Sequence, residues 1–464
     1  MADERENFQP FARRMRDEGL PDVVIRTFKY YYRQLLEGQT GLIPESTIDA
    51  VRSVPDADTF GDDLAQEGEA ALNKTVLVKL NGGLGTSMGL ERPKSLLKVR
   101  HDLTFLDIIA RQALRANVPL VLMNSFNTRR ETLEALEQYP SLHHSDLPLD
   151  FLQHKVPKVR QSDLEPAEWP EEPEMEWCPP GHGDIYTALV TSGMLQQMLE
   201  AGYEYAFVSN SDNLGAVLDA GILGYFVDND LPFLMEVADR TPADRKGGHL
   251  ARLSDGRLVL RESAQCPEED QDAFQDVERH RYFNTNNLWL HLPTLQKVLE
   301  ERDGILGLPM IRNEKTVDPR DKKSYAVYQL ETAMGSAISV FEGAGAVRVP
   351  RSRFAPVKTT GDLLAVRSDA FKMTSDYRMV MAEARKDRGL VVELDPTYYQ
   401  LIDMMEARFS CGPPSLVACD LFKVEGDVNF GCDVVARGSV HIVHEDGRQV
   451  HIDDDTILEG DYEL

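Results

Sequence analysis

The sequence predicts an α/β protein with a mainly parallel mixed sheet, preceded by a helical arm and followed by a parallel β-helix. Three observations lead to this prediction: short apolar runs alternate with helix-like patterns from Thr75 to about Asp369, apolar residues before residue 70 recur at helical spacing, and the last fifty residues have a six-residue apolar period. The expected parts are a helical segment over 1–70, the main domain over 71–370, a helical connector over 371–415 and the β-helix over 416–464.

The N-terminal segment is expected to be helical and to pack on the main domain as an arm. Its apolar residues lie three to five positions apart and form two stripes. The stripes are Phe8, Phe11, Met15 and Leu20, and then Val24, Phe28, Tyr31 and Leu35.

Continuous apolar runs in the main domain indicate buried strands. The clearest runs are Val76–Leu80, Pro119–Met123 and Tyr205–Ser209. Buried strands that alternate with helices are typical of a mainly parallel sheet covered on both faces. Ligands of such sheets bind beyond the carboxyl ends of the strands, where Asn81–Gly89 and 210–213 are expected to lie.

The last part of the chain has an apolar residue at every sixth position, with one polar interruption. The positions are Leu416, Phe422, Val428, Val434 and Val440, followed by Ile452, Leu458 and Leu464. This period, with glycines nearby, is typical of the coils of a parallel β-helix. An array of ordinary hairpins is the alternative, and the length over which the register holds favours the β-helix.

The composition is ordinary for a globular protein except for its formal net charge of −27. Such a surface repels nucleic acid and anionic membranes, so neither is expected as a partner. An anionic substrate would have to be attracted by a local cluster of Lys, Arg and main-chain N–H groups. Halophily is another origin of strong acidity.

Five cysteines are expected to be reduced thiols, because their number is odd and none has CxxC spacing. They are Cys178, Cys266, Cys411, Cys419 and Cys432. The first residues lack the basic start and apolar run of a signal peptide, and no apolar stretch approaches the length of a membrane span. A cytoplasmic location is therefore expected.

The run over 75–89 gives the strongest local signal for a ligand site. An apolar strand breaks into a loop with glycines at 82, 83, 85 and 89. Glycines let the main chain approach a ligand closely, and the N–H groups of such a loop can hold phosphate oxygens. Lys94 follows directly and adds a cation. The loop matches neither the P-loop nor the dinucleotide-binding pattern, so a tight turn remains the alternative until other motifs are considered.

Two further motifs suggest contacts to phosphate. His182 lies between Gly181 and Gly183 and could donate to a phosphate, although a lone histidine is more often structural. Asp212 follows the strand Tyr205–Ser209. A carboxylate at that point can hold Mg²⁺, which would bridge phosphates; a helix cap or a turn is the alternative.

Polar segments further along the chain are candidates for binding a sugar phosphate. Asn284 and Asn286 lie beside an apolar strand, and side-chain amides suit sugar hydroxyls, or belong to a turn. Glu262 could accept from a hydroxyl or form a surface ion pair, and Lys246-Gly247 could contact phosphate or form a hairpin turn. Lys358 follows a Pro-Val pair that would fix its place, which favours a phosphate contact over a solvated surface.

Taken in order, these segments resemble the UTP–glucose-1-phosphate uridylyltransferase family of the eukaryotic type. The matching stretches cover most of the chain and are Lys79–Gly89, Leu122–Phe126, Gly181–Asp184, Ser209–Gly215, Phe283–Leu288, Arg351–Leu363 and Val424–Val428. The resemblance implies a Rossmann-like nucleotidyltransferase domain over 71–370 and a left-handed parallel β-helix at the C-terminus. It also implies uridylyl transfer from UTP to glucose 1-phosphate, which gives UDP-glucose and pyrophosphate.

The resemblance implies a role for each candidate residue. Leu80, Asn81, Gly82 and Gly83 would contact uracil and ribose, and Gly85, Thr86 and Lys94 the triphosphate. Met123 and Gln153 would line the uracil pocket, and Gly181 would also bind the nucleotide. A glutamine amide can match the donor and acceptors of uracil, whereas cytosine presents a reversed pattern. His182, Asn210, Lys246 and Gly247 would contact phosphate and sugar, and Glu262, Asn284 and Asn286 the sugar.

The implied mechanism is in-line attack of the sugar phosphate oxygen on the α-phosphorus. Lys94, Lys358 and Asp212 would be the catalytic residues, with Asp212 holding Mg²⁺ as the cofactor. The chain departs from the family pattern at Leu90-Glu91-Arg92, where smaller residues are usual, so Arg92 adds a phosphate contact or closes the loop differently. The acidic insert before Gly181 is also longer than is usual in the family.

Other functions remain open at this point. The acceptor could be galactose 1-phosphate or N-acetylglucosamine 1-phosphate, although Leu84 and Ser87 stand where N-acetylglucosamine relatives usually have glutamine and arginine. The chain could also be a non-catalytic sensor of nucleotide sugars. The presence of Lys94, Asp212 and Lys358 argues against this hypothesis, because a protein that only binds does not need these charges. Because exposed edges of a β-helix often pair, a homo-oligomer through the C-terminal part is also expected.

Overall fold

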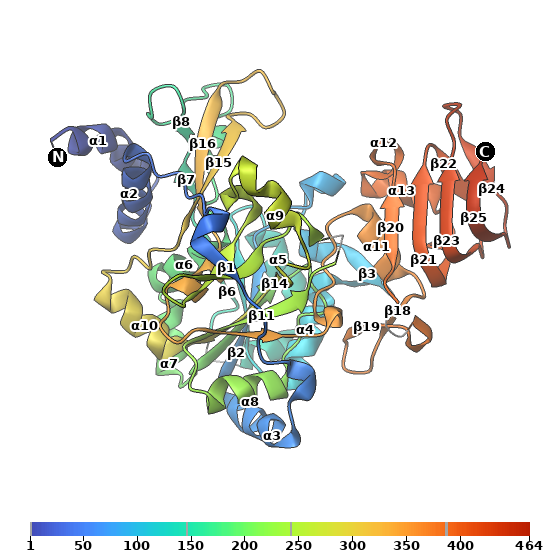
Figure 1. Ribbon diagram of the computed structural model, residues 1–464, viewed down its shortest axis with the longest axis horizontal. Coiled ribbons are helices and arrows are strands. Elements are labelled where there is room, and N and C mark those ends of the chain that lie inside the picture. Colours follow the sequence, from blue (N-terminus) through green and yellow to red (C-terminus); the bar gives the residue numbers. More distant parts are fainter. Residues whose placement is uncertain (1, 145–146, 242–243, 386–387) are drawn as a thin grey trace.

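The computed structural model describes residues 2–144, 147–241, 244–385 and 388–464. A ten-stranded sheet forms the centre, two helices and a small sheet lie at one end, and a stack of strands lies at the other end (Figure 1). None of the helices in these ranges has the length and apolar character needed to span a bilayer.

The central sheet is mixed, and most of its strands run in one direction. Its order is β1-β12-β14-β10-β2-β5-β6, with β13 beside β12, β11 beside β14, and β17 beside β11. The pairings align β2, β5, β6, β10, β11, β12 and β17 in one direction and β1, β13 and β14 in the other. The strands are β1 (Ile48–Ala50), β2 (Thr75–Asn81), β5 (Leu120–Asn124), β6 (Asp150–Leu152), β10 (Tyr205–Asn210), β11 (Phe233–Asp239), β12 (His249–Leu253), β13 (Leu258–Arg261), β14 (Tyr282–His291) and β17 (Gly345–Arg348).

The three buried runs expected from the sequence are strands of this sheet, as predicted. They are β2, β5 and β10, and β2 pairs in parallel with the other two. The loops after β2 and β10 therefore leave the same edge of the sheet, which is where a parallel sheet binds its ligands.

Helices cover both faces of the sheet because β2 sends alternate side chains into two apolar clusters. Leu77 packs in the cluster that contains α4 and α8, and Val76 and Val78 pack in the cluster that contains α6, α7 and α10. These helices and the others near the sheet are α3 (Asp62–Ala71), α4 (Phe105–Ala116), α5 (Arg129–Leu136), α6 (Ile185–Thr191), α7 (Met194–Glu200), α8 (Ala220–Asp228), α9 (Gln271–Gln275), α10 (Leu292–Glu301) and α11 (Thr360–Arg367).

The N-terminal arm has the expected helices α1 (Ala2–Asp17) and α2 (Asp22–Leu36). Their apolar stripes pack on the small sheet beside them, in a cluster that includes Val159, Met310 and Leu330. That region contains β7 (Val156–Pro157), β8 (Val159–Arg160), β9 (Trp177–Cys178), β15 (Met310–Thr316) and β16 (Ala326–Thr332). The segment is not helical throughout, because β1 leaves the arm and pairs with β12 at the edge of the central sheet.

The C-terminal part consists of parallel strands, an arrangement that fits a β-helix. Phe422 pairs with Val440, 18 residues later, so one coil spans three of the predicted six-residue periods. The periodic residues from Leu416 to Leu458 are buried, whereas Leu464 is 43% exposed. The strands are β20 (Val391–Leu394), β21 (Ser415–Glu425), β22 (Val428–Phe430), β23 (Val435–Val443), β24 (Val450–Ile452) and β25 (Ile457–Glu463).

The connector differs from the helical segment expected over 371–415. It contains α12 (Pro396–Tyr399) and α13 (Ile402–Arg408), but β20 already belongs to the C-terminal sheet. The short pairs β3 (Lys98–Arg100) with β4 (Leu103–Thr104), and β18 (Phe371–Met373) with β19 (Met379–Met381), lie between the two large parts. One apolar cluster runs without a break from Phe207 in the central sheet to Phe422 in the C-terminal coils.

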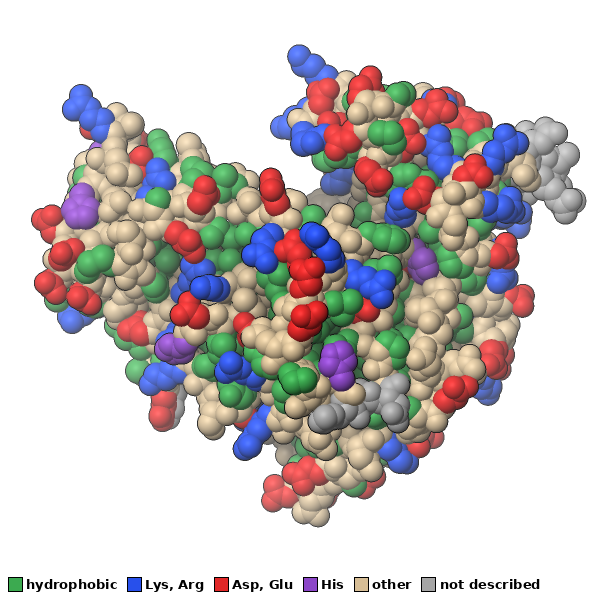
Figure 2. All heavy atoms as spheres, turned by 180° about the vertical axis from the view of Figure 1, so that it is seen from behind, with side chains coloured by type: hydrophobic (Ala, Val, Ile, Leu, Met, Phe, Trp, Pro, Cys, Tyr) green, Lys and Arg blue, Asp and Glu red, His purple; other side chains and the backbone are tan. Residues whose placement is uncertain are grey.

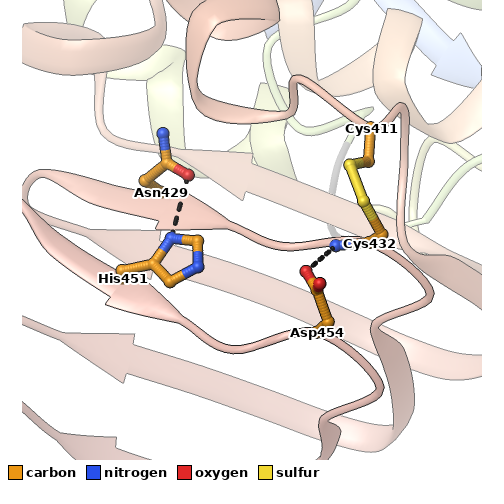
Figure 3. Close-up of a disulfide and its surroundings, with 5 residues drawn as sticks. All are labelled: Cys411, Asn429, Cys432, His451 and Asp454. Atoms are coloured by element: carbon orange, nitrogen blue, oxygen red, sulfur yellow. Dashed lines mark hydrogen bonds between the residues drawn. A yellow bond between two sulfur atoms is a disulfide. The ribbon is translucent and has the colours of Figure 1, made fainter.

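The prediction of five reduced thiols is wrong for two of the cysteines. Cys411 and Cys432 form a disulfide with their Cα atoms 5.1 Å apart, and beside it the Cys432 N–H donates to Asp454 (Figure 3). The two residues are 21 positions apart in sequence, and stacking of the end of α13 on the coil after β22 brings them together. Cys178, Cys266 and Cys419 are free and buried.

Candidate functional site

The glycine loop after β2 lies against the residues expected to bind the nucleotide base. A Cβ added to Gly82 would lie 2.6 Å from Oε1 of Gln153, so only glycine lets this glutamine approach the loop. Ser125 donates to the Gly82 carbonyl at 2.9 Å and fixes the loop from the β5 side. In the described parts of the chain, the Gly83 N–H donates no main-chain hydrogen bond and can serve a phosphate oxygen, whereas Gly85 lies beside the bridge that joins Leu84 to Pro93.

Three of the expected charged residues come together at the edge where β2 and β10 end. Lys94 Nζ lies 2.7 Å from Asp212 Oδ2, and both side chains are mostly buried. Lys358 is exposed, but the preceding residue Val357 is buried and donates its N–H to the Asp212 carbonyl at 3.2 Å. The main chain therefore holds Lys358 next to the Lys94–Asp212 pair.

The expected sugar-binding residues form a second group beside the first. Burial raises the pKa of Glu262, while hydrogen bonding to Asn284 and the charge of Lys358 oppose that rise. The Asn284 amide donates to Asn286 Oδ1 at 2.9 Å, and Asn286 has a left-handed φ of 59°. The charge of Lys358 therefore acts on Glu262, and this interaction connects the expected sugar-binding residues to the expected phosphate-binding residues.

Glycines shape the wall beside Glu262. A Cβ on Gly248 would lie 2.5 Å from the Glu262 carboxylate, and one on Gly247 would lie 2.0 Å from the ring of Phe283. Lys246 precedes this close contact and is exposed. The segment 246–248 therefore packs on the expected sugar-binding residues through its two glycines.

His182 belongs to a loop that packs on the end of β16. Gly181 has a left-handed φ of 78°, and a Cβ there would lie 2.4 Å from the Thr332 carbonyl. His182 Nδ1 accepts the Met334 N–H at 3.0 Å, and a Cβ on the next residue, Gly335, would lie 3.2 Å from the Asn284 amide. His182 is thereby connected to the sugar group, and its neutral ring carries its proton on Nε2, where it can donate.

The pKa of His182 gives a testable pH dependence. Burial lowers this pKa from 6.5 to about 4, so the folded protein holds the ring neutral while the unfolded chain takes up a proton below pH 6.5. We therefore expect the unfolding free energy to fall between pH 6.5 and about 4, by up to about 3 kcal/mol from this group. Urea unfolding of the wild type and of His182→Gln across this range measures it; equal pH slopes would contradict the assignment.

Several candidate residues are more buried than a direct contact requires. Asn81 is 2% exposed and donates to Asn124 and Thr132, and Met123 is 1% exposed within the apolar core. Leu80 and Asn210 pair with each other across β2 and β10. The predicted base contact of Met123 stays a prediction. Arg92 was a further candidate for a phosphate contact. Its Nε lies 2.6 Å from Glu131 Oε2, so its guanidinium already forms an ion pair.

A buried polar network beneath the site was not predicted. Glu236 is 0% exposed and accepts from Arg353, Asn287 and Trp289. The Asn213 amide joins this network to the Asp212 loop, because it donates to the Arg353 carbonyl and accepts the Ala355 N–H. The sequence did contain one sign of this network, because Glu236 interrupts the apolar run of β11.

The face of the molecule seen from behind carries charges of both signs. Seen from behind, the molecule has a concave upper edge between the C-terminal part and the lobe formed by β8, β15 and β16 (Figure 2). Lys and Arg side chains lie beside Asp and Glu side chains on this face, without a continuous basic area. The positive charge relevant to an anion is therefore that of the few residues described above.

Comparisons of the sequence and of the fold with known proteins agree with one another. Residues 25–437 match the family model described as UTP–glucose-1-phosphate uridylyltransferase. The chain is 41% identical over 400 residues to the UTP–glucose-1-phosphate uridylyltransferase of Hordeum vulgare, covering 84% of this chain and 82% of that protein. Its structure is similar to that of a point mutant of the UDP-glucose pyrophosphorylase from Leishmania major in complex with UDP-glucose, with a TM-score of 0.92, 44% identity and 99% of both chains covered. A UDP-glucose phosphorylase from Trypanosoma brucei has a TM-score of 0.90 at 44% identity, covering 99% of this chain and 100% of that one.

Proposed function

Because the chain belongs to the UTP–glucose-1-phosphate uridylyltransferase family, we propose that it transfers uridylyl from UTP to glucose 1-phosphate, giving UDP-glucose and pyrophosphate. The observation that carries this proposal is the gathering of Lys94, Asp212 and Lys358 beside a glycine loop in which the Gly83 N–H has no main-chain partner among the described residues. Two polyanions can meet in an acidic protein only where such a group neutralises them.

The chemistry needs positioning and charge stabilisation rather than a covalent intermediate. The phosphate oxygen of the sugar forms a bond to the α-phosphorus, and the bond to the pyrophosphate oxygen breaks on the opposite side. The nucleophile is already an anion, so no general base is required. Lys94, the loop N–H groups and Thr86 hold the triphosphate, and Lys358 stabilises the charge that develops on the phosphoryl oxygens.

Asp212 fits the role of a magnesium ligand. Its Oδ2 accepts from Lys94 and its other oxygen can face a cation. Within the described ranges, no group of three or more His, Cys, Asp or Glu side chains could hold a metal. A single carboxylate suits Mg²⁺ in such sites, because substrate phosphates and water supply its other ligands. When bound beside Asp212, Mg²⁺ would neutralise phosphate charge.

The base and the sugar are recognised by amides and one carboxylate. Gln153 against Gly82 would pair with uracil, with Leu80 and Gly83 along the nucleoside. Glu262, Asn284 and Asn286 would bind the sugar hydroxyls, with Gly247 and Lys246 beside them, and His182 and Asn210 would lie between sugar and phosphate. An unpaired amide facing cytosine would cost about 1–3 kcal/mol, which favours UTP over CTP.

The test is a pyrophosphate-release assay of the purified chain. We expect release with UTP, glucose 1-phosphate and MgCl₂, much slower release with CTP, ATP or GTP, and none in excess EDTA. A faster reaction with galactose 1-phosphate or N-acetylglucosamine 1-phosphate than with glucose 1-phosphate would identify that sugar phosphate as the acceptor instead. Binding of UDP-glucose without any pyrophosphate release would support a non-catalytic sensor instead.

We also propose that the C-terminal strands form a left-handed parallel β-helix through which the protein self-associates. β25 is the last strand of the four-stranded sheet, no strand of the described residues pairs with its outer edge, and its first residue, Ile457, is 54% exposed. We expect light scattering to give a mass above that of one chain, and Ile457→Lys to reduce it. Leu42→Lys, at a leucine that is 41% exposed on the N-terminal side, is the matched control. A monomer at high concentration would contradict the proposal.

A further inference from the structure

Lys79 is an unusual residue to find inside the central sheet. It lies in β2 with 0% exposure, and its Nζ donates to Ser209 Oγ and to the Ala216 carbonyl, both at 2.7 Å. These partners are neutral oxygens, and among the residues that the structure describes no direct ion pair offsets the cost of burying the ammonium group. Burial lowers the pKa of Lys79 to about 7. An apolar residue would serve the stability of the sheet better, so a lysine here calls for another explanation.

The two acceptors of Lys79 flank the segment that carries Asp212. Ser209 belongs to β10 just before this segment, and Ala216 lies just after it. Near Ala216 there are also two local turns, from the Ala216 N–H to the Asn213 carbonyl and from the Val217 N–H to the Gly215 carbonyl, and the Val217 carbonyl accepts from Arg353. The lysine therefore closes the 209–216 loop from inside the protein.

The 209–216 loop is held on its outer side by groups that are expected to meet the substrate. On that side the carboxylate contacts Lys94, and the Asp212 carbonyl accepts from Val357. Both of these partners belong to segments expected to contact phosphate. Inside the protein the Asn213 amide holds the middle of the loop through Arg353 and Ala355, and Lys79 joins its two ends; neither tie has to move when substrate binds.

We propose that Lys79 is a positioning residue for the reaction: by tying Ser209 to Ala216, it sets the place of the Asp212 carboxylate relative to Lys94. This inference rests on the proposed function of Asp212. It distinguishes Lys79 from Lys94 and Lys358, because its buried side chain reaches the substrate only through the loop.

The test replaces Lys79 with methionine, which keeps the volume and removes the charge and both hydrogen bonds. We expect a folded protein whose kcat falls by about 10- to 100-fold, the range seen when groups that orient a metal ligand are removed. The half-saturating Mg²⁺ concentration should rise by a similar factor. Calorimetric titration of UTP, with and without Mg²⁺, should show the loss mainly in the Mg²⁺-dependent part of binding, a readout independent of turnover.

Lys158 offers a matched control. It is also a buried lysine, 4% exposed, and its Nζ donates to the Val317 carbonyl at 2.8 Å. This contact lies beside β15 and β16, away from the 209–216 loop. Lys158→Met should lower stability without changing kcat or the Mg²⁺ dependence. Equal effects of the two changes would reduce Lys79 to a structural residue and overturn the inference.

The remaining outcomes separate this inference from the proposed function. If Asp212→Asn is impaired while Lys79→Met has normal kcat and Mg²⁺ dependence, the positioning role is refuted and the proposed function stands. If Asp212→Asn is fully active, Asp212 has no role for Lys79 to support. Should Lys79→Met fail to fold, Ser209→Ala removes one of the two ties, and an unchanged Mg²⁺ dependence in that variant would also overturn the inference.

Discussion

Replacing Lys358 with alanine is expected to lower kcat by about 100- to 1000-fold, the effect of removing a preorganised charge from a phosphoryl-transfer site. The side chain is exposed, and the segment before it is anchored by the buried Val357 and its bond to the Asp212 carbonyl. Truncation therefore removes a charge without opening the core. Initial rates at saturating UTP and glucose 1-phosphate measure the loss, and circular dichroism checks the fold.

Lys372 provides the control for this prediction. It is also an exposed lysine, and it lies in β18, outside the candidate site. Lys372→Ala should leave kcat unchanged, although it changes the net charge by the same amount. A Lys358→Ala enzyme with near-normal turnover would remove Lys358 from the mechanism while leaving the family assignment in place.

Replacing Glu236 with glutamine is expected to lower the unfolding free energy by about 3–5 kcal/mol, the cost of breaking a buried ion pair from one side. The carboxylate accepts from Arg353 Nη2 at 2.6 Å and Nε at 2.8 Å, and from Asn287 and Trp289 at 3.0 Å. A glutamine keeps the shape but turns an NH₂ group toward one of these donors. It also removes the nearest counter-charge of the buried Arg353 guanidinium and leaves Asp219, 3.8 Å away, as its acidic partner.

Urea unfolding measures this loss, and Glu314→Gln is the matched control. Glu314 pairs with Arg312 on the surface, with a side chain that is 59% exposed, so its loss should change stability by less than about 1 kcal/mol. Because Arg353 also donates to the Val217 carbonyl, Glu236→Gln should lower kcat too. A loss of stability similar to that of Glu314→Gln would show that the network is dispensable.

Local patterns were enough to predict the parts of the fold that depend on one segment. The apolar runs of β2, β5 and β10, the two helices of the arm and the six-residue period each follow from side chains close together in sequence. The position of the glycine loop and of Asp212 follows in turn, because parallel strands end at a common edge.

The features that were missed depend on contacts between distant segments. Arg353 and Glu236 are 117 residues apart, and Lys79 and Ser209 are 130 apart, so neither sequence neighbourhood contains its partner. Charged residues within apolar runs marked both places but did not say what would pair with them. The Cys411–Cys432 disulfide is similar, because only the stacking of coils decides which cysteines meet.

The apolar cluster that extends from Phe207 to Phe422 means that the C-terminal coils are not a detachable appendage. A chain cut after residue 415 would leave the sheet's helical cover facing water, so we expect it to aggregate rather than to persist as a smaller enzyme. The intact chain should accordingly melt in a single calorimetric step instead of two. A substitution that destabilises the C-terminal coils would then lower the unfolding free energy of the whole molecule, including the part that carries the candidate site.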